Sequence, residues 1–320
     1  MDLQTEFLSL TRASSEAEFI AIALSSTRHD FLAKAKDGSP VFLFQDASIA
    51  KYTPGLKLRN LTVEFHVTCR VQTAAGPIED QFALVSCDDS VPELFELFIR
   101  CFAAAAERLA IGAGTAEIKN NLQGLLDLFR AMSKPSGRAV SGLWAELFVI
   151  AKSMHIESAL RAWRSSPFDR FDFSWFDQCL EVKATTNALR AHEFSLEQLQ
   201  APLGREGFVA SILLQPLSGG TGVMDLATAI ETAVSGKQTL RQKLWGNIAS
   251  ALGSDFSSKL DVRFDISYAE RNFIIFAMGD VPAPPLPSDG RISNIRFQSD
   301  LTSAKSSLPS SSIVQLANVF

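Results

Sequence analysis

Three charged side chains stand close together in a short stretch that is otherwise apolar. Residues 171–185 read FDFSWFDQCLEVKAT and place Asp172, Glu181 and Lys183 among Phe, Trp, Leu and Val residues. Carboxylate oxygens are ligands that Mg²⁺ prefers, and a nearby ammonium group can orient water or offset charge on a phosphate. The pattern therefore points to metal-assisted chemistry on a phosphate. The plain alternative is a structural ion pair between Asp172 and Lys183.

The spacing of these residues predicts a hairpin that carries all three charges on one face. FDFSWF and QCLEVKAT are two β-prone runs, and a two-residue turn at 176–177 would set Asp172 opposite Glu181. A turn at 177–178 would instead set Asp172 opposite Lys183. The charges share a face in both registers because strand side chains alternate. Carboxylates opposite each other repel, and a divalent cation between them would resolve this conflict.

A third acid can come from the helix predicted at GLWAELFVIAKSMH, residues 142–155. Glu146 lies near the N-terminal half of this helix, beside its apolar face. Glu146 is therefore the candidate that would complete the acidic set.

Other polar residues have competing interpretations. Asp169 is the alternative to Asp172 as the first acid of the site, but the Ser-Ser-Pro-Phe sequence that precedes it is typical of a turn. His192 either contacts a phosphate or simply packs just before a capping box, and that box also explains Gln198. The sequence SGGTG at 218–222 lacks the Lys-Ser/Thr of a phosphate-binding loop and is predicted to be an ordinary loop.

Apolar periodicity and turn residues predict the surrounding elements. A capping box at Ser15 and Glu18 predicts a helix through 19–24, and a second one at Ser90 and Glu93 predicts the next helix. Residues 261–268 and 272–278 are predicted to pair as a hairpin. Further helices are expected at 93–109, 118–132, 157–166, 194–200, 225–234 and 240–253, and strands at 39–45, 56–71 and 207–216.

Composition limits the classes of function. The chain has 320 residues, 47% of them hydrophobic, and a net charge of −5, so any phosphate-binding surface must be local. The four cysteines are scattered, the N-terminus lacks the basic region of a signal peptide, and the apolar stretch at 94–110 carries charges at helical spacing. These features predict a cytoplasmic protein without a membrane span.

The motif as a whole resembles the PD-(D/E)xK nuclease superfamily. Asp172 followed by Glu181-Val182-Lys183, with Glu146 upstream on a helix, carries the likeness, although Phe171 stands where the motif has proline. The sequence is most similar to PD-(D/E)xK-motif proteins encoded beside bacterial restriction and phage-defence genes. The stretches that carry this closer likeness are 142–150, Trp163, 172–173, 180–185, and His192 with 195–199.

The resemblance implies an α/β fold with a restriction-endonuclease-like core, a mixed sheet flanked by helices. This core would occupy residues 113–216, between an N-terminal α+β domain at 1–112 and a C-terminal α+β region at 217–320 that packs on the core. The stretch at 157–166 reads more helical than extended, which leaves the order of strands in the core open.

The resemblance also implies the roles of the site residues. Asp172, Glu181 and Glu146 would bind Mg²⁺, for which Mn²⁺ can substitute, and the backbone carbonyl of Val182 would add a ligand. Lys183 would position the attacking water. His192, Gln198 and Arg170 are candidates for substrate contact. DNA would further be contacted by basic residues around the hairpin, namely Arg161, Arg164, Arg190 and Arg205.

Two functions follow as expectations. The first is metal-dependent hydrolysis of DNA, as an endonuclease of a restriction or phage-defence system. The second is a catalytically inactive DNA-binding or scaffold subunit of a defence complex. The partners expected are DNA and other restriction or defence subunits, with a homodimer as one arrangement, and no membrane.

Overall fold

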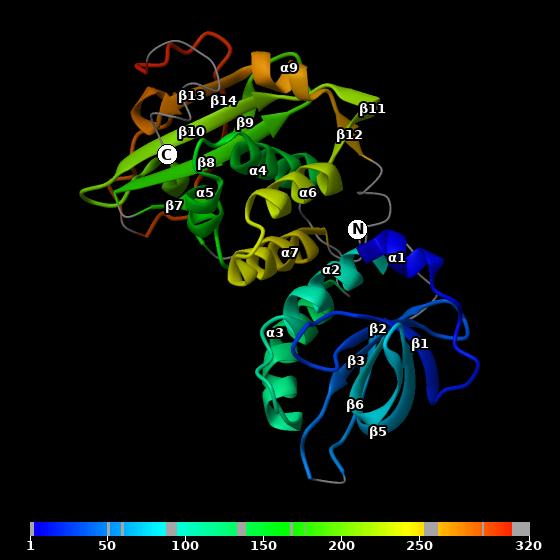
Figure 1. Ribbon diagram of the computed structural model, residues 1–320. Helices are drawn as coiled ribbons and strands as arrows, with labels where there is room; N and C mark the ends of the chain where they lie inside the picture. Colours follow the sequence, from blue (N-terminus) through cyan, green and yellow to red (C-terminus); the bar gives the residue numbers. More distant parts are fainter. Residues whose placement is uncertain are drawn as a thin grey trace. The chain divides into compact units, whose positions relative to one another are not determined.

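A computed structural model describes most of the chain. The residues described are 3–49, 52–58, 61–87, 95–132, 139–166, 169–175, 177–252, 262–289 and 291–308, with backbone only at 124 and 127–132. Helices and strands are mixed along the chain, so the fold class is α/β as predicted (Figure 1).

The chain divides into two compact units. One contains Met1–Ser136 with Trp245–Ser257, and the other contains Gly137–Leu244 with Ser258–Phe320. Residues 113–136 therefore group with the N-terminal part of the chain, whereas the sequence suggested boundaries after residues 112 and 216. Residues 137–216 and most of the C-terminal region form one unit, and this unit carries the charged hairpin.

The strands of the first unit form a sheet that closes on itself. β1 pairs antiparallel with β2 and parallel with β5, so the strand order β1-β2-β3-β6-β5 returns to its start. The elements of this unit are α1 (Leu3–Ser9), β1 (Glu18–Ala23), β2 (Phe31–Lys34), β3 (Pro40–Gln45), β4 (Leu56–Lys57), β5 (Leu61–Thr73), β6 (Gly76–Cys87), α2 (Phe95–Ala106), α3 (Thr115–Met132) and the C-terminal part of α7 (Gln238–Leu252).

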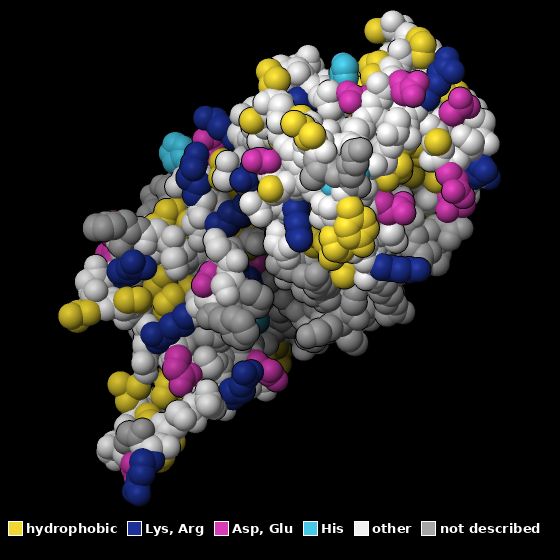
Figure 2. Space-filling model, turned by 90° about the horizontal axis from the view of Figure 1, so that it is seen from below, with side chains coloured by type: hydrophobic (Ala, Val, Ile, Leu, Met, Phe, Trp, Pro, Cys, Tyr) yellow, Lys and Arg dark blue, Asp and Glu magenta, His cyan; other side chains and the backbone are white. Residues whose placement is uncertain are grey.

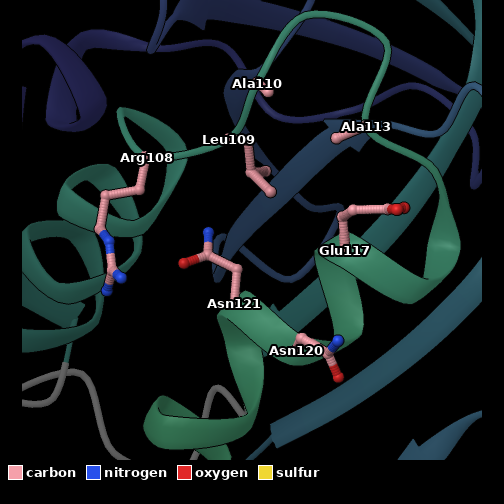
Figure 3. Close-up of a pocket in the computed structure, with 7 residues that line it drawn as sticks. All are labelled: Arg108, Leu109, Ala110, Ala113, Glu117, Asn120 and Asn121. Atoms are coloured by element: carbon pink, nitrogen blue, oxygen red, sulfur yellow. The ribbon is translucent and has the colours of Figure 1, made fainter.

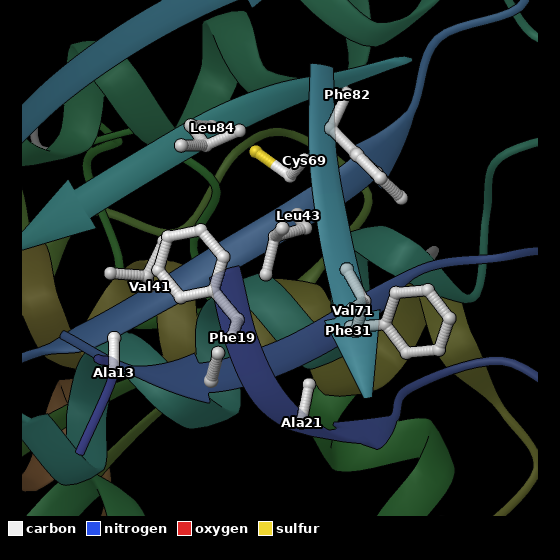
Figure 4. Close-up of a cluster of buried hydrophobic side chains, with 11 residues drawn as sticks. Ala13, Phe19, Ala21, Phe31, Val41, Leu43, Cys69, Val71, Phe82 and Leu84 are labelled. Carbon is white, nitrogen blue, oxygen red and sulfur yellow. The ribbon is translucent and has the colours of Figure 1, made fainter. Parts of the chain in front are cut away.

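Alternating side chains fill the interior of this closed sheet. Phe19 and Ala21 of β1 are buried, whereas Glu18 and Ile20 are exposed. The helix predicted through 19–24 is wrong, because this alternation fits a strand and both neighbouring strands supply hydrogen-bond partners. Figure 4 shows the resulting cluster, which also contains Phe31, Val41, Leu43, Val71 and Phe82.

The second unit contains a mixed sheet with the strand order β13-β10-β8-β7. β8 and β10 are parallel, and the strands on either side of this pair are antiparallel to it. The elements are α4 (Val140–Lys152), α5 (Ile156–Ala162), β7 (Phe173–Ser174), β8 (Gln178–Thr185), β9 (Ala191–Ser195), η2 (Leu196–Leu199), β10 (Glu206–Leu213), β11 (Pro216–Gly222), α6 (Val223–Ala233), the N-terminal part of α7, β12 (Arg263–Phe264), α9 (Ile266–Arg271), β13 (Phe273–Ala277), η4 (Met278–Asp280) and β14 (Arg296–Asp300).

Helix α4 packs on β8 and α6 and is the apolar centre of this unit (Figure 1). Trp144 and Phe148 are fully buried and stacked on each other, and Trp144 Nε1 donates a hydrogen bond of 2.8 Å to the carbonyl of Thr221. The predicted apolar face of this helix is therefore confirmed. Because the helix is buried from Leu143 to Ile150, Glu146 is carried into the interior with it.

Two predictions about the C-terminal region are wrong. Residues 261–268 and 272–278 do not pair with each other: β12 pairs with β11, β13 pairs with β10, and α9 lies between them. The predicted loop at 218–222 is part of strand β11. Gly220 permits this pairing, because a Cβ there would lie 2.4 Å from the carbonyl oxygen of Phe264.

The remaining helices largely follow the predicted periodicity. The helices predicted at 118–132, 142–155, 225–234 and 240–253 correspond to α3, α4, α6 and α7, and the helical reading of 157–166 corresponds to α5. The capping box predicted at Ser90 and Glu93 lies outside the described residues. Among the residues described, no helix is both long enough and apolar enough to span a membrane.

Candidate functional site

The hairpin of β7 and β8 adopts the first of the two predicted registers. Phe173 pairs with Leu180, and the backbone N–H of Trp175 donates a 2.8 Å hydrogen bond to the carbonyl of Gln178. Continued by one residue, this register sets Asp172 opposite Glu181. The alternative register, with Asp172 opposite Lys183, is wrong.

Asp172 is buried, and its two carboxylate oxygens have different surroundings. Oδ2 accepts a hydrogen bond of 2.8 Å from the backbone N–H of Val182 on β8. Oδ1 lies 3.5 Å from Nη1 of Arg164. The main chain of the same two residues is also joined, because the N–H of Arg164 donates to the carbonyl of Asp172 at 2.8 Å. The carboxylate is thus held in one orientation by strand β8.

Glu146 is similarly anchored through one oxygen. Its side chain is only 2% exposed, and Oε2 accepts a 2.8 Å hydrogen bond from the indole Nε1 of Trp163. Oε1 lies 3.3 Å from Nη2 of Arg164. The guanidinium of Arg164 therefore bridges the carboxylates of Glu146 and Asp172, which come from a helix and from the start of the hairpin.

Glu181 is the third buried carboxylate. Its Oε1 accepts a 2.6 Å hydrogen bond from Nε2 of Gln198 and lies 2.9 Å from Nζ of Lys183. Burial, and then the charge of Asp172, raises the pKa of Glu181 to about 8, although Lys183 and Arg164 favour the ionised form. The cationic partners therefore do not fully offset the cost of burying this charge.

Lys183 is positioned by the short helix η2. Its Nζ donates a 3.1 Å hydrogen bond to Oε1 of Gln198, and this oxygen also accepts a 3.0 Å bond from the N–H of Ser195. The ammonium group lies 5.1 Å from the ring centre of Phe194. The capping box predicted for Ser195 and Gln198 is confirmed. The same Gln198 amide also joins Lys183 to Glu181.

Val182 contributes its backbone to the same place. The N–H and C=O of one strand residue point to the same neighbouring strand. Because the N–H of Val182 donates to the Asp172 side chain, its carbonyl also faces the β7 edge of β8. At this point β7 is not paired with β8, since its ladder begins at Phe173. This geometry is compatible with the ligand role that the resemblance implies for the Val182 carbonyl.

The other predicted contact residues occupy structural positions. His192 is buried on β9, where Nε2 forms a 2.8 Å hydrogen bond with Oγ of Ser211. Burial, followed by the charges of Lys183 and Arg190, lowers the pKa of His192 to about 4, so the ring is neutral at pH 7. The guanidinium of Arg170 donates from Nε and Nη2 to the carbonyl of Glu197.

The rival acid is held in a turn. Oδ2 of Asp169 accepts hydrogen bonds of 2.8 and 3.0 Å from the backbone N–H groups of Ser165 and Ser166. This is the turn geometry that the sequence predicted for Asp169. Asp172, and not Asp169, lies with the buried carboxylates.

The sequence missed the position of Arg164. The sequence suggested Arg164 only as one of several basic residues that could contact DNA, and it did not predict that Arg164 contacts the carboxylates. The signal that could have found it is its neighbour, because Trp163 was already part of the family likeness. Trp163 forms an antiparallel bridge with Phe173, and this bridge sets Arg164 opposite Asp172.

No preformed metal cage is present among the described residues: no group of three or more His, Cys, Asp or Glu side chains is arranged so that it could hold a metal ion. The side chains of Arg164, Lys183 and Gln198 contact the carboxylate oxygens instead. The three acids that the sequence selected, Glu146, Asp172 and Glu181, thus form one carboxylate network together with Arg164, Lys183 and Gln198.

A pocket in the first unit is separate from this network. It has a volume of about 410 Å³, and its lining includes Glu117, Asn120 and Asn121, which rise from α3 (Figure 3). Two of these polar groups serve the local backbone, since Asn121 donates to the carbonyl of Ala105 and Glu117 accepts from the N–H of Gly114. The pocket therefore offers no cluster that resembles a catalytic centre.

Comparison with known proteins identifies the family. The family model described as "Putative PD-(D/E)XK family member, (DUF4420)" matches residues 3–302. No curated protein and no solved structure matches the chain. The matched segment includes all four residues of the motif, Glu146, Asp172, Glu181 and Lys183. Because the match extends over nearly the whole chain, the protein belongs to this PD-(D/E)XK family.

Proposed function

We propose that the protein hydrolyses phosphodiester bonds in DNA with the help of a divalent cation, on a restriction-endonuclease-like core. The observation that carries the proposal is the meeting of three buried carboxylates, Glu146, Asp172 and Glu181, with Lys183 in contact with one of them. Membership of a PD-(D/E)XK family supports nuclease-like activity in general. The mixed sheet with α4 packed on β8 supports the core architecture.

The donor set fits a hard divalent cation such as Mg²⁺, with Mn²⁺ as a substitute. The oxygens of Glu146, Asp172 and Glu181 and the carbonyl of Val182 are the ligands that Mg²⁺ prefers. Burial, and then the charge of Asp172, raises the pKa of Glu181, so the ionised form of this carboxylate is costly in the absence of a further cation. A divalent cation between the carboxylates would favour that ionised form. These four residues would therefore hold it.

Each protein group then has a defined task. A cation bound here would supply Lewis-acid stabilisation of the charge that develops on the phosphate. Lys183 lies beside Glu181 and is oriented by Gln198, so its ammonium group can donate a hydrogen bond to a water molecule or to a phosphate oxygen. Trp163 and the Val182 N–H keep Glu146 and Asp172 oriented while substrate binds.

The substrate class and cellular setting follow from the family resemblance. The sequence resembles PD-(D/E)xK-motif proteins encoded beside bacterial restriction and phage-defence genes, and this resemblance supports DNA as the substrate and a cytoplasmic defence system as the setting. Other defence subunits or a second copy of the chain are the partners proposed. On the face shown in Figure 2, Lys and Arg side chains are interspersed with Asp and Glu, so contact with DNA would depend on local groups of charge.

Cleavage of DNA by charge-neutral variants tests the proposal. With Mg²⁺ or Mn²⁺, Asp172→Asn, Glu181→Gln and Lys183→Met should each lower the cleavage rate by about 10³-fold or more, because each removes a group that acts on the phosphate or its cation. The matched control is Asp169→Asn, which alters a carboxylate that accepts hydrogen bonds within a turn and should retain the wild-type rate. Cleavage at the wild-type rate by all three variants would end the proposal.

Calorimetry separates the alternative function from this one. Wild-type protein should bind Mn²⁺, and the Asp172→Asn and Glu181→Gln variants should bind it at least tenfold more weakly. If the wild-type chain binds DNA but neither Mg²⁺ nor Mn²⁺, the protein is instead a DNA-binding or scaffold subunit with an inactive site.

A further inference from the structure

The guanidinium of Arg164 lies between two of the proposed metal ligands. It is 3.3 Å from Oε1 of Glu146 and 3.5 Å from Oδ1 of Asp172. These two oxygens come from elements distant in the sequence, and a single planar cation contacts both. A guanidinium carries one positive charge, so it offsets only part of the negative charge that the three carboxylates bring together.

The other oxygen of each carboxylate is anchored by a neutral donor. Trp163 Nε1 holds Oε2 of Glu146 at 2.8 Å, and the Val182 N–H holds Oδ2 of Asp172 at 2.8 Å. Neither donor depends on the Arg164 side chain. If that side chain moves, both carboxylates remain oriented toward the same space.

The side chain of Arg164 is placed so that it can move. It is 18% exposed, and it follows Trp163, the residue that caps the C-terminus of α5. Its main chain is held separately, through the hydrogen bond from its N–H to the Asp172 carbonyl. The guanidinium can therefore leave without unfolding the backbone that supports Asp172.

We propose that Arg164 acts as an exchangeable internal cation. In the metal-free chain its guanidinium holds the carboxylates of Glu146 and Asp172 together, and a divalent cation displaces it from their oxygens. The displaced guanidinium then binds a phosphate of the DNA, because its planar set of donors matches two phosphate oxygens. This inference deepens the proposed function and rests on it. It makes Arg164 both a competitor of the metal and a positioning residue for the substrate.

Metal binding without DNA provides the first test. Arg164→Met keeps a long side chain but removes the charge, so Mn²⁺ no longer competes with the guanidinium and should bind about tenfold more tightly by calorimetry. Arg164→Lys keeps a positive charge, so its affinity for Mn²⁺ should be closer to that of the wild type. Arg164→Gln is a second neutral variant and should change the affinity in the same direction as Arg164→Met, which preserves the test if one variant does not fold.

The matched control is Arg241→Met. Arg241 is 20% exposed and lies 3.2 Å from Glu231, so its exposure and ion-pair distance resemble those of Arg164. Its partner is outside the carboxylate network, and the variant should leave Mn²⁺ affinity unchanged. This control separates loss of one cation between the ligands from a general change in net charge.

DNA binding provides the second test. With Mn²⁺ present and Asp172 intact, the affinity for a duplex oligonucleotide should fall about tenfold in Arg164→Met and remain unchanged in Arg241→Met. Unchanged or weaker Mn²⁺ binding in both neutral Arg164 variants would overturn the competitor role, and unchanged DNA affinity would overturn the phosphate role. Failure of the wild-type chain to bind Mn²⁺ would instead overturn the proposed function.

Discussion

Each of the two units buries charged side chains, but the two groups are built differently. In the first unit, Arg28 and Asp30 form a double contact of 2.8 and 3.1 Å, and their side chains are 1% and 0% exposed. The remaining guanidinium donors reach the carbonyls of Ala110 and Gln45. One cation meets one anion, and the surrounding backbone uses the other donors.

The carboxylates of the second unit are not matched in this way. Glu146, Asp172 and Glu181 share the side chains of Arg164 and Lys183, and both of these cations are 18% exposed. The pKa of Glu181 is raised, first by burial and then by the charge of Asp172, although Lys183 lies beside it. A buried pair with matched charges stabilises one conformation, whereas an unmatched group beside partly exposed cations can exchange partners. The comparison teaches that burial of charged side chains alone does not mark a site, whereas several carboxylates that share partly exposed cations do.

Breaking the matched pair should have the largest effect on stability. Asp30→Ala leaves the buried guanidinium of Arg28 without its anion, and removing one partner of a buried pair costs about 3–5 kcal/mol of the free energy of unfolding. Urea denaturation followed by the fluorescence of Trp245, which belongs to the first unit, would measure this loss.

The control for this prediction is a surface pair. Asp289 lies 2.7 Å from Arg291, and their side chains are 41% and 90% exposed, so Asp289→Ala should leave the free energy of unfolding nearly unchanged. If Asp30→Ala costs no more than this surface variant, the pair in the first unit is not the structural element described above.

His192 sharpens the comparison, because it is buried in the second unit against a neutral partner. Its pKa is about 4 when folded and about 6.5 when unfolded, so only the unfolded chain binds a proton between these values. The free energy of unfolding should therefore fall by about 3 kcal/mol as the pH decreases from 6.5 to 4. His192→Gln should remove most of this dependence.

Urea denaturation at pH 4.5 and pH 7 would measure this effect, with Trp144, Trp163 and Trp175 as reporters of the second unit. The exposed His29 provides the control, since it is 50% exposed and His29→Gln removes a histidine from the other unit. An equal pH dependence in wild type and His192→Gln would show that His192 is not the titrating group.

The hairpin was predictable because its information is local. The two-residue period was enough to place Asp172, Glu181 and Lys183 on one face, and one of the two turns considered sets Asp172 opposite Glu181. Glu146 was predictable from the apolar face of its helix. These inferences need only the sequence on either side of each residue, and the structure agrees with them.

Features that depend on distant pairing could not be predicted in the same way. Arg164 meets Asp172 only because the chain folds back through the bridge between Trp163 and Phe173. Likewise, residues 19–24 are too few to separate a helix from a strand, and pairing with β2 and β5 decides the outcome. β13 pairs with β10 rather than with the segment that precedes it in the chain. Local periodicity carries no information about any of these partners.

The smallest change in the free energy of unfolding is expected when the carboxylate of Glu181 is replaced. The pKa of Glu181 is about 8 in the folded chain and near 4.5 when unfolded, so the folded chain holds a proton that the unfolded chain has released. The free energy of unfolding therefore falls as pH rises from 4.5 to 8 and levels off above it. Glu181→Gln should be about 1 kcal/mol more stable than the wild type at pH 9 and equal to it at pH 4.5.

This gain is expected to be modest because Lys183 loses its partner at 2.9 Å in the same variant. Glu206→Gln, at an exposed acid on β10, should show no gain at either pH. The difference in stability between the wild type and Glu181→Gln is most informative when Mn²⁺ is added at pH 8. At about 100 times its dissociation constant, a bound ion stabilises the folded chain by about 2.7 kcal/mol, which the wild type should gain and Glu181→Gln should largely lose. The order of stability of the two proteins should therefore reverse, whereas an unchanged order would mean that Glu181 does not bind the ion.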